Sequence, residues 1–271
     1  MIQWRRYCLR ISHCQKKVNN CMQTHIYKNS TSFLLILVCA FMLFLSACGG
    51  SSSPVKTNQP ATTPTATTVA SAKLLNGPLV YVALGASDAV GVGSQQPGSQ
   101  GYVPLISDRL PKGSHMINLG VSGIHLHEAL TRELPLALNT DPQLITIWLV
   151  TNDFIAGVPY NDYMHDLDSM LKQLHSQTQA RMVMANLPDL TRLPAFARSS
   201  AAQKTQMRSE IQRWNASIAS LAHKYGVTLV DLTAEDSLLT SHPEYISGDG
   251  FHPSAAGYVQ LSNLFWQAIK S

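Results

Sequence analysis

Cysteine is confined to the beginning of this chain of 271 residues: all five cysteines lie at or before Cys48. The remaining 223 residues therefore cannot form a disulfide, a thiolate metal site or a cysteine nucleophile. A domain without such cross-links depends on its hydrophobic core for stability. Residues 76–271 are enough to bury one.

Acidic residues are missing from the first 47 positions, which contain six basic residues. The whole chain has 20 basic and 16 acidic residues, but without this leader it has 14 and 16, a net charge of −2. The basic character thus belongs to the leader, and we expect no nucleic-acid partner. The leader's basic residues are Arg5, Arg6, Arg10, Lys16, Lys17 and Lys28.

An apolar run long enough to span a bilayer is also missing. Residues 33–45 form an apolar run of 13 residues, which is the length of a signal-peptide core. The following Leu45-Ser46-Ala47-Cys48 resembles the bacterial lipoprotein signal, in which the cysteine becomes the lipidated first residue after cleavage. The alternative is an uncleaved anchor with a buried thiol at Cys48. Either interpretation places the domain outside the cytoplasmic membrane, and translation starts at Met1 or Met22.

Charge is nearly absent from residues 51–72, which consist mostly of Ser, Thr, Pro and Ala. Such a composition predicts a flexible tether. The 28 residues from 48 to 75 would span roughly 30 Å as a coil. We therefore divide the chain into a signal peptide (1–47), a linker (48–75) and a folded domain (76–271).

Five apolar segments alternate with helical patterns in this domain. We predict strands at 79–84, 115–119, 144–150, 181–185 and 227–232, and helices at 102–110, 124–130, 161–177, 200–225 and 254–269. The alternation predicts an α/β fold with a five-stranded parallel sheet covered by helices on both faces. Right-handed crossovers bring the carboxyl ends of all strands to one edge, where ligands bind.

A serine follows the first predicted strand in Gly85-Ala86-Ser87-Asp88, although Gly-x-Ser is also ordinary turn chemistry. Far along the chain, Asp249 and His252 stand three residues apart in a loop before the last helix. This spacing lets a carboxylate orient an imidazole as a general base. The alternative is a helix cap beside an incidental surface histidine.

Together these residues resemble the SGNH hydrolases, also called the GDSL esterase/lipase family, over residues 78–270. The matching positions, in the family's order, are Ser87, Gly120 in Asn118-Leu119-Gly120-Val121-Ser122, Asn152 in Thr151-Asn152-Asp153, and Asp249 with His252.

The resemblance implies a three-layer, flavodoxin-like fold and a role for each matching residue. Ser87 would be the nucleophile, His252 the base and Asp249 its orienting partner. The backbone N–H groups of Ser87 and Gly120 and the side chain of Asn152 would form the oxyanion hole. We expect no metal or other cofactor.

Two positions depart from the family pattern. Ala86 stands where the family usually has aspartate, and Val150 where it commonly has glycine. We expect the first to tune activity and the second to narrow the pocket or shift the Asn152 loop. The α/β-hydrolase pattern Gly-x-Ser-x-Gly fits less well, because Ala89 breaks it.

Other polar residues have simpler interpretations. The spacing of His125 and His127, beside Glu128, does not aim both rings at one metal ion, so we interpret them as surface residues. Asp153 and Asp189 follow predicted strands and either line the cleft or cap a turn.

The resulting hypothesis is a secreted, monomeric serine esterase tethered to the membrane through a lipid on Cys48. It would hydrolyse small-molecule or glycan esters with short acyl groups through an acyl-enzyme. Two alternatives stay open: acyl transfer to a sugar hydroxyl, and a non-catalytic carbohydrate- or cell-wall-binding module.

Overall fold

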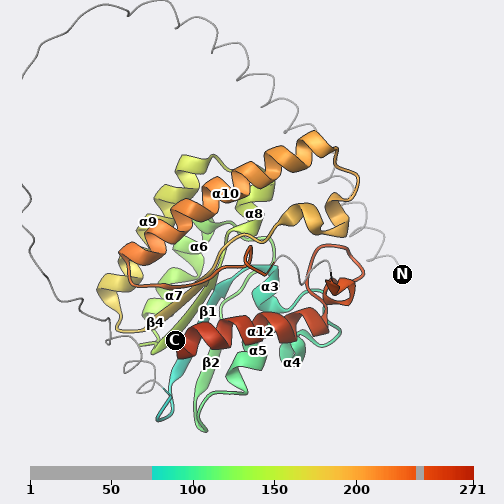
Figure 1. Cartoon of the computed structure of the whole chain (residues 1–271). Helices are drawn as coiled ribbons and strands as arrows, with labels where there is room; N and C mark the ends of the chain where they lie inside the picture. The colour runs from blue at the N-terminus through green and yellow to red at the C-terminus, as the bar shows by residue number, and fades with distance from the viewer. Residues whose placement is uncertain (1–74, 236–240) are drawn as a thin grey trace, which may run out of the picture. The chain divides into compact units, whose positions relative to one another are not determined.

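The sheet has five parallel strands in the order β2-β1-β3-β4-β5 (Figure 1). The computed structural model describes residues 75–235 and 241–271, so the expected leader, Cys48 and the linker up to residue 74 lie outside the described residues. The sheet agrees with the predicted α/β architecture. The strands are β1 (Val80–Gly85), β2 (His115–Asn118), β3 (Leu144–Trp148), β4 (Arg181–Ala185) and β5 (Thr228–Val230).

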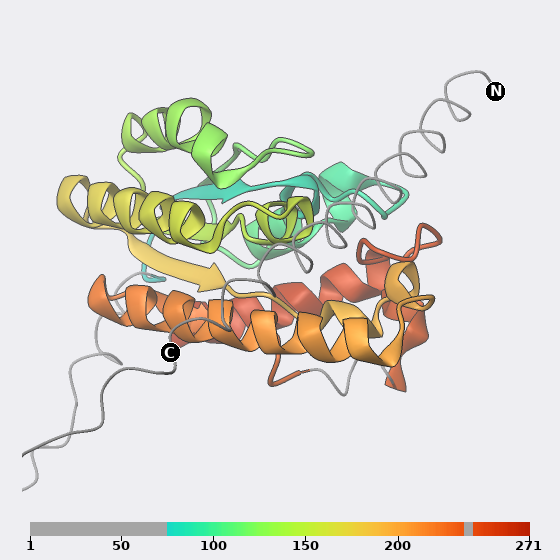
Figure 2. The same ribbon diagram turned by 90° about the horizontal axis from the view of Figure 1, so that it is seen from above.

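Helices cover both faces of the sheet, which Figure 1 shows nearly edge-on. On one face, α12 (Ala255–Lys270) packs against α5 (Tyr102–Ser107), β4 and β5. On the other face, α6 (Leu126–Arg132), α7 (Leu134–Leu138), α9 (Tyr160–Gln177) and α10 (Ala201–Lys224) lie in a row, as the view from above shows (Figure 2). β1 and β3 are consequently buried along almost their whole length.

The strand order creates a crevice between β1 and β3. The chain leaves β1 toward β2 but continues from β3 toward β4 and β5, so right-handed crossovers put the helices that follow β1 and β3 on opposite faces. Ligands bind at the carboxyl ends of the strands where this reversal occurs. Ser87 follows β1 and Asn152 follows β3, so both stand at this point.

Several predicted boundaries were wrong. A short helix that was not predicted, α4 (Pro97–Gln100), precedes α5, and α5 ends at Ser107 and not at residue 110. The helix after β2 is divided into α6 and α7 because Pro135, in the first turn of α7, has no N–H to continue the α6 ladder. The remaining elements are α3 (Ser87–Val90), α8 (Thr151–Ala156), η1 (Leu190–Arg192), η2 (Pro194–Phe196) and η3 (Pro243–Tyr245).

An aromatic group joins α5 and α12 below the end of β3. Tyr102 stacks on Phe265 with ring centroids 4.9 Å apart and meets Trp148 edge-on at 6.3 Å. Burial of these rings anchors both helices against the sheet. Over residues 75–235 and 241–271, no helix has the length and apolar character needed to cross a membrane.

Candidate active site

Ser87 is held at the sheet edge by a very tight strand-to-helix turn. β1 ends at Gly85, and α3 begins two residues later at Ser87. A Cβ on Gly85 would lie 2.6 Å from Cβ of Ala89, so the turn can close only with glycine at this position. The Ser87 side chain is therefore fixed above the crevice, with 7% of the residue exposed.

The loop before α12 brings Asp249 and His252 together. Ile246 and Pro253 form an antiparallel bridge, and the Ser247 N–H donates to the His252 carbonyl at 2.8 Å. Inside this loop Gly250 has φ +74°, a conformation that favours glycine. The loop thus folds on itself, and its two titratable side chains meet on the side that faces Ser87.

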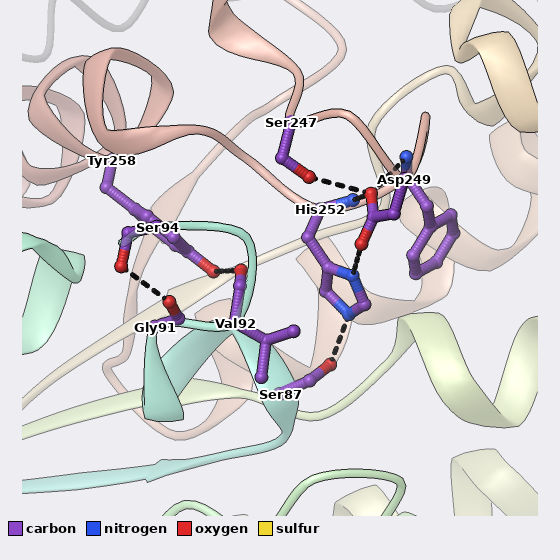
Figure 3. A network of polar contacts seen from close by, with 9 residues as sticks. Ser87, Gly91, Val92, Ser94, Ser247, Asp249, His252 and Tyr258 are labelled. Atoms are coloured by element: carbon purple, nitrogen blue, oxygen red, sulfur yellow. Dashed lines mark hydrogen bonds and ion pairs between the residues drawn. The ribbon is translucent and has the colours of Figure 1, made fainter. Parts of the chain in front are cut away.

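A continuous chain of hydrogen bonds joins these three residues (Figure 3). In the tautomer with the proton on Nδ1, His252 donates to Asp249 Oδ2 at 2.6 Å. Its Nε2 then accepts the Ser87 hydroxyl at 2.9 Å, although the two residues are 165 positions apart. This geometry can move a proton from the serine hydroxyl to the imidazole.

Asp249 is anchored at its second oxygen. Oδ1 accepts hydrogen bonds from the Ser247 hydroxyl at 2.8 Å and from the backbone N–H groups of Phe251 and His252 at 2.8 and 2.9 Å. Burial alone would raise the pKa of Asp249, but the hydrogen bonds from His252, Phe251 and Ser247 outweigh it and hold the pKa well below its usual range. Asp249 is therefore ionised at neutral pH.

The environment of His252 strengthens its basicity. Burial alone would lower its pKa, but the hydrogen bond to Asp249 and the negative charges of Asp88 and Asp249 raise the pKa above its ordinary value. The imidazole is thus a stronger base than a free histidine, and the imidazolium formed by proton transfer is stabilised.

Asp88 is a second carboxyl beside this chain, and it lines a cavity of about 110 Å³ with mostly apolar walls. Thr151, Phe251 and Pro253, the sequence neighbours of Asn152 and His252, also line the cavity, whereas Ser87 does not. The cavity therefore adjoins the hydrogen-bonded chain. Burial raises the pKa of Asp88 to about 6, against the lowering effect of the His252 charge.

Gly120 and Asn152 follow β2 and β3, the strands on either side of β1, and both are engaged in hydrogen bonds in this structure. Asn152 Nδ2 donates to the Ile124 carbonyl at 2.9 Å, which leaves the second N–H of the same amide for another acceptor. The Gly120 N–H donates to Asn118 Oδ1 at 3.0 Å. An oxyanion is a stronger acceptor than this neutral amide, so it can compete for the Gly120 N–H.

The sequence did not point to the residues that pack beside the loop of His252. Gly93 has φ +102°, and a Cβ there would clash with the Pro253 carbonyl and lie 2.9 Å from Cβ of His252. The Tyr258 hydroxyl on α12 donates to the Val92 carbonyl at 2.6 Å (Figure 3). The cluster of glycines after Ser87 was visible in the sequence, but the partner that each glycine approaches was not.

The positions that depart from the family pattern are both buried. Ala86 is 6% exposed and Val150 is 1% exposed. Neither residue lines the cavity that Asp88 lines. Val150 immediately precedes α8, the helix that carries Asn152, so its packing bears on where that helix begins.

The other polar candidates have structural partners. His127 pairs with Asp166 at 3.0 Å, while His125 lies 3.7 Å from Asp153. Asp153 accepts the Leu126 N–H at 3.0 Å at the start of α6, and Asp189 caps η1. Within the part of the chain that the structure describes, no group of three or more His, Cys, Asp or Glu side chains is placed to hold a metal ion.

The model of the GDSL-like lipase/acylhydrolase family matches residues 83–260. The chain belongs to this family. It is an ester-bond hydrolase, and the match includes every residue of the hydrogen-bonded chain from Asp249 to Ser87. No curated protein matches the sequence significantly.

Solved structures share the fold at low sequence identity. A putative GDSL-like lipase from Parabacteroides merdae has a TM-score of 0.60 at 20% identity, with 72% of this chain and 98% of that one covered. The acetylxylan esterase Axe2 from Geobacillus stearothermophilus has a TM-score of 0.56 at 18% identity, with coverage of 73% and 96%. TesA has a TM-score of 0.55 at 22% identity, with coverage of 70% and 98%.

Proposed function

We propose that this hydrolase is a serine esterase with Ser87 as nucleophile, His252 as general base and Asp249 as the residue that orients the imidazole. The observation that carries this proposal is the chain of hydrogen bonds from Asp249 Oδ2 through both nitrogens of His252 to Ser87 Oγ, with lengths of 2.6 and 2.9 Å. A serine hydroxyl is a poor nucleophile until a base within hydrogen-bond reach accepts its proton.

In the proposed reaction, His252 Nε2 takes the Ser87 proton while Oγ attacks the ester carbonyl carbon. The tetrahedral intermediate collapses, the bond to the alcohol oxygen breaks, and the imidazolium gives the proton to the departing alkoxide. Water then attacks the acyl-enzyme with His252 again as base, the bond from the acyl carbon to Ser87 Oγ breaks, and His252 returns the proton to Oγ as the carboxylic acid leaves. The Ser87 and Gly120 N–H groups and Asn152 Nδ2 are the proposed oxyanion donors, each worth about 2.7–4 kcal/mol in the transition state.

A fluorophosphonate probe tests the nucleophile directly. We expect the probe to label the wild-type protein and a Ser99→Ala control, since Ser99 is exposed on α4. Ser87→Ala should not be labelled, and His252→Ala should react far more slowly. An unlabelled wild-type protein, or undiminished labelling of Ser87→Ala, contradicts the proposed mechanism.

For the substrate, we propose carboxylic esters with short acyl groups, carried by small molecules or glycans. Acetylxylan esterases among the similar structures support an acetylated glycan as one such substrate. The test compares kcat/KM over p-nitrophenyl esters of increasing chain length and on acetylated xylo-oligosaccharides. A steady rise with chain length contradicts the short-acyl proposal, and turnover only with a sugar acceptor indicates a transferase.

For the location, we propose a monomer on the outer face of the cytoplasmic membrane, held by a lipid on Cys48. The apolar run at 33–45 and the Ser46-Ala47-Cys48 junction support this proposal. We expect the full chain to carry a lipid and to partition into detergent, and Cys48→Ala to lose the lipid labelling. Cys39→Ala is the matched control. Unchanged lipid labelling of Cys48→Ala contradicts the proposal.

A further inference from the structure

Glu133 is a buried acid that the proposed reaction does not use. It lies between α6 and α7 and is only 1% exposed. Oε2 accepts the Gly85 N–H at 3.0 Å, and Oε1 is buried without a hydrogen-bond partner among the described residues. Burying a carboxyl here is costly, so its position needs an explanation.

The contact between Glu133 and Gly85 lies where the chain that continues β2 separates from the end of β1. The Leu119 N–H donates to the Ala83 carbonyl at 2.9 Å and the Val121 N–H to the Gly85 carbonyl at 3.1 Å. A regular parallel ladder would offer the Leu119 carbonyl to the Gly85 N–H, but Glu133 occupies that place. The Glu133 carboxyl therefore replaces the Leu119 carbonyl as acceptor for the Gly85 N–H, next to the position where the chain turns at Gly120.

Gly85 packs closely against α3, the helix that carries Ser87, and α3 in turn packs against Gly120. A Cβ on Gly85 would lie 2.6 Å from Cβ of Ala89, and one on Gly120 would lie 2.7 Å from the same atom. Ala89 belongs to α3, the helix that begins at Ser87. With so little free space, a shift of the Gly85 peptide must move α3 against Gly120.

The buried carboxyl of Glu133 favours its neutral, protonated form. Burial raises its pKa to about 8, although the N–H group of Gly85 and the charge of Arg132 act in the opposite direction. The carboxyl is therefore mainly neutral at pH 7. In that form it has nearly the shape of a glutamine side chain and offers the same carbonyl oxygen to Gly85.

We propose that Glu133 is a positioning residue for ester hydrolysis: its carboxyl holds the Gly85 peptide and thereby sets the separation between the Ser87 hydroxyl and the Gly120 N–H. The inference rests on the proposed roles of Ser87 and Gly120. It assigns no contact with substrate to Glu133. Its effect appears in the transition state, where nucleophile and oxyanion donor must both be in place.

The experiment compares kcat and KM of Glu133→Gln, Glu133→Asp and Glu133→Leu, with Glu128→Leu as the control on the exposed side of α6. Glutamine keeps the reach and the carbonyl oxygen, so we expect kcat within about threefold of the wild-type value. Aspartate is one methylene too short to reach Gly85, and leucine has no acceptor. Both should lower kcat by up to roughly 100-fold with little change in KM, as expected for a displacement of about 1 Å.

Circular dichroism and fluorophosphonate labelling of the same proteins separate the possible failures. Wild-type kcat in folded Glu133→Asp or Glu133→Leu overturns the positioning role. So does a glutamine variant that is as slow as the aspartate variant. If leucine prevents folding, the glutamine and aspartate pair still decides the question. A wild-type enzyme that is not labelled on Ser87 refutes the proposed mechanism instead, because that result does not involve Glu133.

Discussion

Asp249 holds His252 at two places, with Oδ2 at 2.6 Å from the ring Nδ1 and Oδ1 at 2.9 Å from the backbone N–H. The ring cannot rotate without losing the first contact, and the loop cannot move without losing the second. Orientation of the base toward Ser87 is thus determined by one carboxylate.

Replacing this carboxylate with an amide should disable the base while leaving the loop intact. In Asp249→Asn one oxygen can still accept backbone N–H groups, but an amide nitrogen beside Nδ1 favours the wrong tautomer of His252. We expect kcat to fall by roughly 10⁴-fold with a nearly unchanged KM. Steady-state kinetics measure this, with circular dichroism as the folding control. A loss below tenfold would contradict the assigned role.

The charge of Asp88 should be visible in the pH dependence of kcat/KM. His252 must be neutral to accept a proton, so activity rises as pH increases through its pKa, which lies above the ordinary value of 6.5. The negative charge of Asp88 contributes to that increase, so Asp88→Asn should move the acidic limb to lower pH. Asp162→Asn, an exposed acid on α9, is the control. An unmoved or raised midpoint excludes this coupling.

Because Gly120 packs against Ala89, the effects on kcat/KM of substitutions at these two positions should not be additive. Gly120→Ala brings a methyl group to 2.7 Å from Cβ of Ala89 and should displace α3 with Ser87, lowering kcat by roughly 10- to 100-fold. Ala89→Gly removes the obstacle, so the double variant should recover part of the loss. A double-mutant cycle on kcat/KM should give a coupling of about 0.5–3 kcal/mol. Strict additivity means that the two residues do not compete for space.

The buried proton of Glu133 should make stability fall as pH rises. The pKa is about 8 in the folded chain and 4.5 in an unperturbed glutamate, so the folded state binds more protons between these values. The free energy of unfolding therefore decreases with pH across this window. The charges of Arg132 and Glu128 shift the folded pKa in opposite directions, and titration of His252 adds a slope of the same sign.

Comparison of variants isolates the contribution of Glu133 to this slope. Glu133→Gln cannot titrate, so its unfolding free energy should fall less steeply than that of the wild-type protein between about pH 5 and 8. Urea unfolding at several pH values measures the difference. Asp162→Asn, which removes an exposed acid on α9, should keep the wild-type slope. Identical slopes for the wild-type and Glu133→Gln proteins would show that Glu133 is ionised in the folded state.

The amino-acid sequence alone predicts the order of strands and helices along the chain and the positions of the residues that follow them. Continuous apolar runs such as 79–84 and 144–150 end in glycine or polar residues, so the corresponding strands are predicted within a few residues. The parallel sheet followed from the alternation, and the edge position of Ser87 and Asn152 followed from the sheet. Their roles, and those of Asp249 and His252, came from the family resemblance and stay predictions.

The contacts made by the neighbours of these residues depend on the tertiary structure. Gly93 packs against His252, and Tyr258 donates to the carbonyl of the adjacent Val92, so both contacts join segments that are far apart in the sequence. No local pattern distinguishes these two residues from ordinary loop and helix residues. The Gly120 N–H is engaged by Asn118, which depends on a side-chain rotamer. Glu133 looks like an exposed acid between two helices, but the break at Pro135 turns it into the core beside Gly85. Local periodicity places the elements, whereas packing between distant segments determines which polar atoms meet.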